Sequence, residues 1–350
     1  MIVWCSLIIY VVLLRIVFYK NFNSKRTQKL FLILAGIGIV FIMGSRYANI
    51  SLRGDLNNYF RLYYNASHMS LEELLNISTM EYGYIVFNKI LSTIIPWNQM
   101  IIYAEAIICV YAISRYIYIN CKDPFLGILF YICHGFMIFQ LTGFRQAIAM
   151  SICLLSIEFI KNNNPLKFVI TILFAMSFHS TAIIFLPTYI FLKNKVNFKN
   201  IIIYFILCGS LAMISPYLLE LGSFITGTDY TGEGFNGSLI GPIINITIFL
   251  LGLKLSYKFN EKIIEPWKFN MTYIALILYL IRFISLPFER ISFYFVPGAI
   301  VLLVDGIINI KNKKNREYMY IWISIISIIL FLYRVYSTIG INYRFFWEKF

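Results

Sequence analysis

The sequence predicts an all-α, polytopic integral membrane protein, and three observations lead to that fold class. Hydrophobic residues make up 60% of the 350 residues, and charged residues make up only 13%. The mean hydropathy is +0.75. The apolar residues gather in segments of about 20, the length that a helix needs to cross a bilayer core of about 30 Å. A soluble chain of this length with one packed core does not combine these values.

Lysine and arginine lie at opposite ends of these apolar segments. Apart from Lys89 and Lys349, the lysines lie in or beside short linkers such as 20–29, 193–199 and 311–316. Such linkers are typical of the cytoplasmic side of a membrane. Eight arginines fall in or next to the alternate connections, which we therefore expect outside: Arg46, Arg53, Arg61, Arg145, Arg282, Arg290, Arg334 and Arg344. Because guanidinium groups bind phosphate or carboxylate in a bidentate manner, the outer face is the expected working face.

Ten apolar segments are long enough to cross a membrane. They are 2–20, 30–46, 98–119, 124–141, 144–161, 200–220, 240–258, 267–286, 290–310 and 317–337. The first begins at Met1 without a cleavage signal, so we expect a retained helix.

Residues 167–192 need a different arrangement, because lysines flank this apolar stretch on both sides. A single crossing would place one lysine-rich flank outside, against the charge rule. We therefore expect a broken hairpin of two short helices, about 167–178 and 180–192, that turns at His179–Ser180. The total becomes about 12 membrane helices with both termini outside. Each arm is short, so the turn should lie at the floor of a cavity below the outer surface.

The chain is expected to form a single membrane domain, 1–350, with two long outer connections. Residues 47–97 contain a polar stretch and then an apolar run that is too short to span, which predicts an amphipathic helix lying on the membrane face. Residues 221–239 are rich in glycine, threonine and acidic residues, which favours a mobile loop that could cover a site as a lid.

Charge and cysteine usage exclude several other classes of function. Much of the net charge of +14 comes from the cytoplasmic lysines, so it does not indicate nucleic-acid binding. The six cysteines lie in or at the ends of apolar segments without C-x-x-C spacing, which is typical of small buried side chains. No metal-binding signature is present, and we expect neither a metal site nor a cofactor.

The first candidate site residues lie in the long outer connection. Arg53 and Asp55 place a cation and a carboxylate just outside a membrane helix, and Tyr59 follows them. The alternative for this pair is a solvated ion pair in a loop. Glu81 begins the expected interfacial helix, where a carboxylate also favours the positive end of the helix dipole without any further role.

Two further candidates lie at breaks between apolar segments. Arg145 and Gln146 stand at the outer start of a spanning helix, where an unpartnered cation costs a few kcal/mol. A snorkelling arginine is the alternative. His179 stands at the tip of the hairpin, and a histidine there could accept a proton from a hydroxyl group. The alternative is a turn residue that only breaks the helix.

A last group of candidates lies at a late outer turn. It contains Arg282, Glu289, Arg290 and Tyr294. We expect Glu289 to pair with one of the two arginines and to leave the other available for a ligand.

These candidates carry short motifs in a characteristic order. The motifs are R-G-D-x-x-x-Y at 53–59, E-x-G-Y at 81–84, F-R-Q-A-I-A at 144–149, A-x-x-F-H-S at 175–180 and E-R-x-x-x-Y at 289–294. Together they resemble the EpsG family, whose members are Wzy-like polymerases of bacterial exopolysaccharide and O-antigen. The similarity runs from about Arg46 to Phe295.

The resemblance implies a multi-pass enzyme of the bacterial cytoplasmic membrane with a GT-C-like helical core. Such an enzyme joins oligosaccharide repeat units carried on undecaprenyl pyrophosphate at the outer, periplasmic side. The growing chain moves from its lipid carrier to the non-reducing end of an incoming unit, without a nucleotide sugar or a required metal. The implied partners are the lipid-linked substrate, the bilayer, and the proteins that regulate chain length and flip the repeat unit, with no nucleic acid.

That chemistry suggests roles for the candidate residues. Breaking a glycosyl–pyrophosphate bond raises negative charge on the leaving group, and preorganised cations stabilise it. Arg145 and Arg290 are the candidates for this catalytic role, and His179 or Asp55 is the candidate base. Substrate contacts are expected from Arg53, Tyr59, Glu81, Gln146, Arg282, Glu289 and Tyr294.

Two other functions would use similar residues. A flippase or transporter of lipid-linked sugars also needs outer arginines, but alternating access predicts charged groups near the midplane and repeated halves. An O-antigen ligase would share the donor and the outer site and differ only in the acceptor. A structural scaffold would leave the outer arginines unexplained.

Overall fold

The computed structural model describes residues 2–48, 55–194, 198–226, 240–257, 264–283, 287–338 and 343–348. These residues form helices and connecting turns, and the bridge between Arg46 and Phe345 is an isolated β-pair. The chain divides into two compact units. Unit 1 comprises Met1–Ile183 and Ile321–Phe350, and unit 2 comprises Ile184–Tyr320.

Unit 1 contains the helices that hold most of the candidate residues. They are α1 (Ile2–Val17), η1 (Tyr19–Asn21), α2 (Lys25–Gly44), α3 (Asp55–His68), α4 (Leu71–Ile77), α5 (Tyr82–Ile94), α6 (Met100–Asn120), α7 (Pro124–Cys133), α8 (Phe136–Gln140), α9 (Phe144–Lys161) and α10 (Pro165–Met176). The 3-10 helix η2 (Ser180–Phe185) follows α10, and α18 (Lys313–Thr338) returns the chain to this unit.

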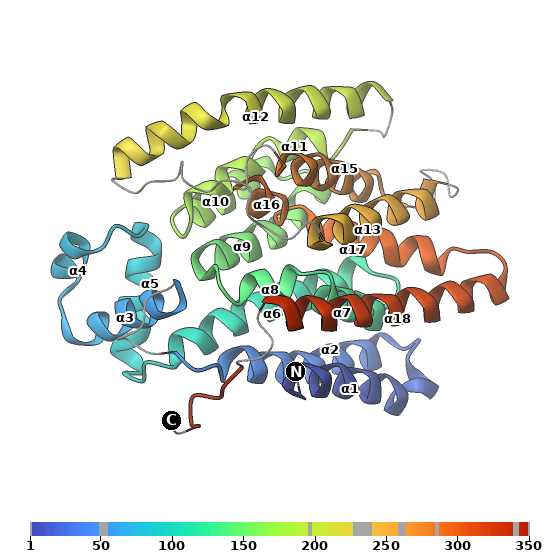
Figure 1. The fold of residues 1–350 in the computed structure, drawn as a ribbon, viewed down its shortest axis with the longest axis horizontal. Helices are drawn as coiled ribbons and strands as arrows, with labels where there is room; N and C mark the ends of the chain where they lie inside the picture. Colours follow the sequence, from blue (N-terminus) through green and yellow to red (C-terminus); the bar gives the residue numbers. More distant parts are fainter. Residues whose placement is uncertain are drawn as a thin grey trace. The chain divides into compact units, whose positions relative to one another are not determined.

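The core of unit 1 is a set of long helices packed in order. Helix α2 packs against both α1 and α6, and α9 packs against both α6 and α10. The shorter helices α3, α4 and α5 pack against one another and form a group beside α6 (Figure 1). The last residues of the chain are tied to the end of α2, since Phe346 N donates to Ser45 O and Tyr47 N donates to Arg344 O.

Local sequence signals explain where several of these helices begin. The Asp123 carboxylate accepts hydrogen bonds from the amides of Phe125 and Leu126, and Pro124 occupies the first turn of α7. Ser70 and Glu73 form a reciprocal capping box at the start of α4. Such side chains satisfy amide groups that have no partner within the helix.

Unit 2 contains α11 (Thr188–Phe191), α12 (Phe198–Thr226), α13 (Ile240–Tyr257), α15 (Pro266–Ile281), α16 (Pro287–Ser292) and α17 (Val296–Ile308). Helix α17 packs against α13 and α15, and α15 also packs against α12 and α16. One buried ion pair joins α15 to α17, with Lys268 Nζ 2.7 Å from Asp305 Oδ2. A buried charge needs such a partner because its desolvation is costly.

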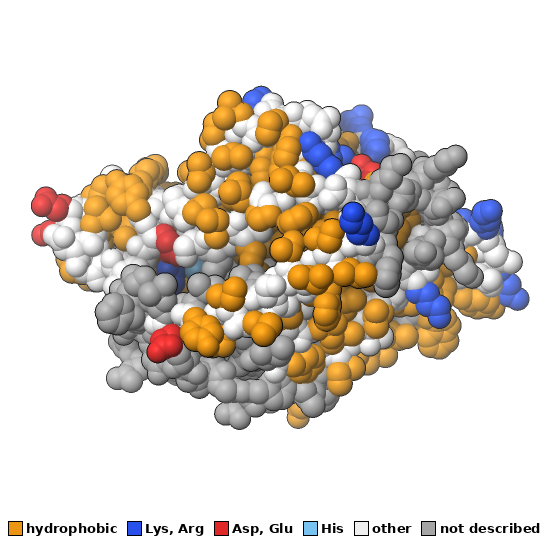
Figure 2. Space-filling view, turned by 90° about the horizontal axis from the view of Figure 1, so that it is seen from above, with side chains coloured by type: hydrophobic (Ala, Val, Ile, Leu, Met, Phe, Trp, Pro, Cys, Tyr) orange, Lys and Arg blue, Asp and Glu red, His pale blue; other side chains and the backbone are white. Residues whose placement is uncertain are grey.

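The all-helical fold class is confirmed. Three helices among the described residues are long and apolar enough to cross a membrane: Lys25–Gly44, Met100–Asn120 and Lys313–Tyr336. Shorter apolar helices accompany them, including Ile2–Val17, Pro124–Cys133 and Val296–Ile308. Hydrophobic side chains also cover much of the face shown in Figure 2, as expected where lipid replaces water. The count of about 12 membrane helices stays a prediction.

Some expected segments are interrupted. The segment expected over 124–141 is split into α7 and α8 by Gly135, whose φ of 87° lies in the left-handed region that favours glycine. The expected break at His179–Ser180 is present, because α10 ends at Met176 and η2 begins at Ser180, whereas the hairpin itself stays a prediction. Its second arm consists of η2 and the short α11 instead of one α-helix. Pro187, which precedes α11, has no N–H to continue a helix from η2.

The two outer connections differ in how far they are described. Residues 55–94 form α3, α4 and α5, so the expected polar stretch is itself helical. Of the expected lid, residues 221–226 end α12, and residues 227–239 lie outside the described residues.

Candidate active site

A carboxylate at the start of α5 connects three separate parts of unit 1. Glu81 occupies the N-cap position of α5, but its side chain makes no capping hydrogen bond. Its Oε1 atom lies 2.8 Å from His179 Nδ1 and accepts a hydrogen bond of 3.2 Å from the Ser180 amide. Its Oε2 atom pairs with Nη1 of Arg145. We call Glu81, Arg145, His179 and Tyr59 the Glu81 cluster.

The hydrogen bond to Glu81 assigns the proton on the His179 ring. An ionised carboxylate has no proton to donate, so Nδ1 of His179 must be the donor. In the neutral ring the other nitrogen, Nε2, then carries the lone pair. The imidazole is thereby held in the tautomer that can accept a proton at Nε2, and one-fifth of the side chain is exposed.

A glycine allows α5 to approach the turn that carries His179. A Cβ atom on Gly83 would lie 2.2 Å from Oγ and 2.7 Å from the carbonyl oxygen of Ser177. No side chain fits in that space, since real Cβ contacts are longer. The first turn of α5 therefore lies directly against Ser177, the residue that follows α10. This close approach brings Glu81 within reach of Ser180.

Arg145 is held from two sides at the start of α9. Besides its ion pair with Glu81, its guanidinium lies close enough to Tyr59 for the two side chains to interact electrostatically. The Tyr59 ring stacks on Phe144 with centroids 5.0 Å apart, and Tyr84 meets it edge-on. The Nε atom of Arg145 is buried and has no hydrogen-bond partner among the described residues. One donor of this cation therefore makes no hydrogen bond within the described residues.

The charges in the cluster stabilise the ionised form of Glu81. Burial opposes ionisation, but the hydrogen bond and charge of His179 and the charge of Arg145 outweigh it and lower the Glu81 pKa to about 2. Burial raises the pKa of Tyr59, although the neighbouring Arg145 acts in the opposite direction. At neutral pH the cluster thus contains a carboxylate, a guanidinium and a neutral phenol.

Three other predicted site residues of unit 1 are not members of this cluster. Gln146 is buried in α9 directly after Arg145. Asp55 is exposed at the start of α3, and its charge acts on Tyr59 without a direct bond to the cluster. Arg53 lies outside the described residues.

The late outer turn forms a second cluster within unit 2. Arg282 Nε lies 3.3 Å from Glu289 Oε2, so Glu289 pairs with one arginine as expected. Tyr279 donates a hydrogen bond of 2.9 Å to Glu289 Oε1, and Asn245 donates one of 2.7 Å to the Tyr279 hydroxyl. Arg290 is exposed.

Tyr294 is buried beside Phe185 in the same unit. This cluster belongs to unit 2, whereas the Glu81 cluster belongs to unit 1.

The sequence predicted the residues of the Glu81 cluster as candidates, but it did not predict that Glu81 contacts both His179 and Arg145. Glu81 and Arg145 are 64 positions apart, and Glu81 and His179 are 98 positions apart, so no local pattern joins them. The role of Phe144 as a platform for Tyr59 was also missed. The only available signal was the glycine two residues after Glu81, which indicates a close backbone approach. No group of three His, Cys, Asp or Glu side chains within the described ranges could hold a metal ion.

The comparison with protein families gives the decisive observation. The model of the EpsG family matches residues 29–347, which is nearly the whole chain. The chain belongs to the EpsG family. The match confirms the resemblance to this family, whose members are Wzy-like polymerases. No curated protein and no solved structure matches the chain.

Family membership and the apolar helices together define the class of this EpsG protein. It is an integral membrane protein of a polysaccharide-polymerase type, and the family is associated with glycosyltransferase-like activity. The four members of the Glu81 cluster come from four of the five motifs.

Proposed function

We propose that this EpsG-family protein joins oligosaccharide repeat units carried on undecaprenyl pyrophosphate. The reaction would take place at the outer face of the bacterial cytoplasmic membrane. The observation that supports this proposal is the bridge that Glu81 makes between His179 and Arg145. The bridge brings an imidazole and a guanidinium to one carboxylate. Glycosyl transfer from a pyrophosphate needs a proton acceptor and a cation for the leaving group, and these two side chains are suited to those roles.

His179 is the proposed general base. Its Nδ1–H is engaged by Glu81, so Nε2 can take the proton from the acceptor hydroxyl. Glu81 then acts as a positioning residue, because it fixes the tautomer and stabilises the positive charge that forms on the ring. This arrangement follows the logic of a carboxylate–histidine pair in other enzymes.

Arg145 is the proposed cation for the leaving group. Its Nη1 atom is held by Glu81 and its charge acts on Tyr59, while the buried Nε remains without a partner among the described residues. A guanidinium held in this way does not need to reorganise when charge develops on the pyrophosphate. Lysine could not reproduce this forked arrangement of donors.

The proposed reaction is balanced without an additional reactant. The acceptor hydroxyl oxygen forms a bond to the anomeric carbon of the donor glycan, and the bond from that carbon to the pyrophosphate oxygen breaks. The hydroxyl proton goes to His179 Nε2, and the electron pair leaves with the lipid pyrophosphate beside Arg145. The ring then releases its proton to solvent before the next cycle.

The remaining sequence predictions are part of the same proposal. In unit 1, Arg53 and Gln146 are proposed substrate contacts, and Asp55 stays the alternative base. In unit 2, Arg290 stays a second candidate cation for the leaving group, and Tyr294 and the Arg282–Glu289 pair are proposed substrate contacts. The proposal also retains about 12 membrane helices, a GT-C-like core, and partners that flip the repeat unit and regulate chain length.

Deleting the gene and complementing it with variants tests the reaction class. Loss of the glycan ladder with retention of a single repeat unit on the final acceptor would support a polymerase. Loss of every repeat unit from the acceptor would contradict it and favour a ligase or a flippase. Labelling of lipid-linked units on the outer leaflet separates those two, because only a flippase defect leaves the units inside.

A further inference from the structure

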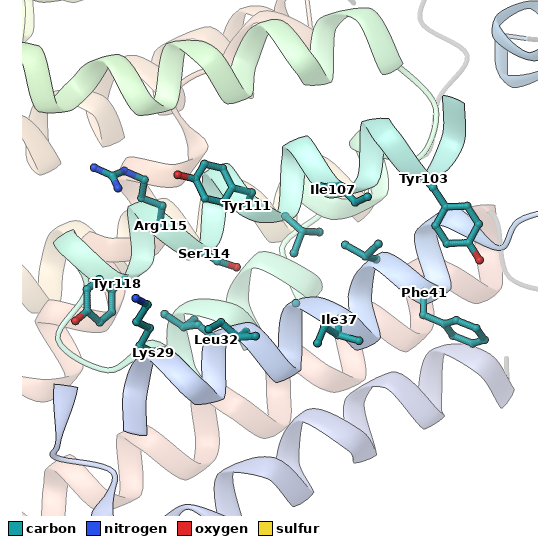
Figure 3. Close-up of a pocket in the computed structure, with 14 residues that line it drawn as sticks. Lys29, Leu32, Ile37, Phe41, Tyr103, Ile107, Tyr111, Ser114, Arg115 and Tyr118 are labelled. Carbon is teal, nitrogen blue, oxygen red and sulfur yellow. The ribbon is translucent and has the colours of Figure 1, made fainter. Parts of the chain in front are cut away.

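A long groove runs along unit 1 between two of the helices that are long enough to cross a membrane. It lies between α2 and α6 and has a volume of about 820 Å³ (Figure 3). The two helices approach closely at Gly36, where an added Cβ would lie 3.2 Å from Val110 Cγ1. Both residues belong to the groove lining, so this close approach forms its floor.

The middle of the groove is apolar and faces away from the core. Ile37 of α2 and Ile107 of α6 line it, and these side chains are 60% and 48% exposed. In a membrane protein, exposed aliphatic side chains on spanning helices contact lipid chains. The groove extends along α2 from Lys29 to Phe41, about 18 Å at 1.5 Å per residue. One leaflet of the hydrocarbon core is about 15 Å thick, so the groove has the length of one acyl chain.

One end of the groove is basic and the other is aromatic. Lys29, Arg115 and Tyr118 lie at the end near the start of α2, while Phe41 and Tyr103 lie at the far end (Figure 3). Arg115 is neutralised by a bidentate pair with Glu158. Lys29 takes part in none of the ion pairs found among the described residues.

A second lysine strengthens the positive charge at this end. Lys25 lies one turn before Lys29 on α2, and its Nζ atom is 5.3 Å from the centre of the Tyr118 ring. Lys25 also takes part in none of the ion pairs of the described ranges. Two exposed lysines without an acidic partner therefore stand where an apolar groove reaches the helix end. Basic sites of this kind between membrane helices attract anionic lipid headgroups.

We propose that this groove binds one anionic phospholipid from the leaflet at the lysine-rich end of α2. One acyl chain lies along Ile37 and Ile107, and the phosphate lies between Lys25 and Lys29. Tyr118 provides an interfacial ring beside the headgroup. This site is independent of the proposed reaction, because none of its residues belongs to the Glu81 cluster.

The test measures lipid retention on the full-length protein purified in a mild detergent. Native mass spectrometry would follow binding of phosphatidylglycerol and of phosphatidylcholine, which differ in headgroup charge. The variant Lys25→Gln/Lys29→Gln removes the charges, and Ile107→Trp fills the groove but keeps both lysines. The control Lys313→Gln/Lys314→Gln changes two exposed lysines at the start of α18.

We expect wild type and the control to prefer phosphatidylglycerol. Near a membrane surface each lysine contributes about fivefold to binding of an anionic lipid, so the double variant should bind it about 30-fold more weakly. Ile107→Trp should lose both lipids. Equal retention of both lipids by all variants would overturn the proposal. It would also fail if the wild type formed dimers that Ile107→Trp dissolves, since the occupant would then be a second copy of the chain.

Discussion

The Nδ1 atom of His179 lies 2.8 Å from Oε1 of Glu81, although 98 positions separate the two residues along the chain. The same carboxylate also pairs with Arg145. The Glu81 side chain at the start of α5 therefore orients two groups from elsewhere in the chain. Arg145 lies in the first turn of α9, and His179 lies in the turn between α10 and η2.

Replacing Glu81 by glutamine should lower the rate of chain elongation by roughly 10²–10⁴-fold, the range that a positioned base contributes. The amide removes the charge that stabilises the protonated His179 ring, but it keeps the size of the side chain. The rate would be measured from glycan ladders at equal protein level, together with its pH profile.

Glu158→Gln is the matched control, because Glu158 also pairs with an arginine but lies on the α6–α9 contact away from His179. This variant should elongate chains normally. Similar losses from both variants, or an unchanged pH profile in Glu81→Gln, would mean that Glu81 acts only through stability.

Arg145→Lys should reduce elongation by roughly 10²–10³-fold, the usual effect of removing one preorganised donor to a developing anion. Lysine retains the charge, so the variant should still insert and accumulate. Arg115→Lys is the control, since it alters another arginine–glutamate pair of the same unit.

Exchanging the two charges of the Glu81–Arg145 pair distinguishes its effect on activity from its effect on stability. Glu81→Arg/Arg145→Glu should recover part of the thermal stability lost in Arg145→Ala, because opposite charges still meet. It should not recover activity. Normal glycan ladders from Arg145→Lys and Arg145→Ala would remove Arg145 from the site.

The ionisation of Glu81 should make the stability of the protein depend on pH in one direction. Its pKa falls from 4.5 to about 2 on folding, so the folded state favours the carboxylate. The contribution is fully present above about pH 4.5 and is lost as the pH falls towards 2. The difference in thermal stability between wild type and Glu81→Gln should therefore persist down to about pH 5 and shrink below that. A difference that already disappears by pH 6 would contradict the lowered pKa.

Gly83→Ala should impair activity, although alanine favours helices more than glycine does. Its Cβ would lie 2.7 Å from the carbonyl oxygen of Ser177, so the start of α5 must move away from the turn that carries His179. We expect shorter glycan ladders and a lower melting temperature.

Gly209→Ala is the control for this substitution, because among the described residues no atom beyond its chain neighbours and its own helix backbone lies within 4 Å of the added carbon. It should be neutral or slightly stabilising. If Gly83→Ala were also neutral, the close approach of α5 to Ser177 would not position Glu81.

Much of the fold was predictable because membrane helices depend on local composition. The apolar segment 144–161 coincides with α9, and 30–46 and 98–119 overlap closely with α2 and α6. The break near His179 followed from the lysines on both sides of one apolar stretch. In each case the lipid solvent requires a long apolar run with its backbone hydrogen bonds satisfied internally, and the sequence displays such a run directly.

The sequence alone determined the helical membrane class, the family motifs and the identity of the residues in the candidate site. The tertiary structure decided that Glu81, and not Asp55, contacts His179 and Arg145. It also decided that Arg282 is the partner of Glu289. These pairings depend on how helices far apart in the chain pack together, and the contact at Gly83 shows that a single missing Cβ permits one of them. Helix formation is local, whereas the distance between two charged groups is set by the packing of the whole unit.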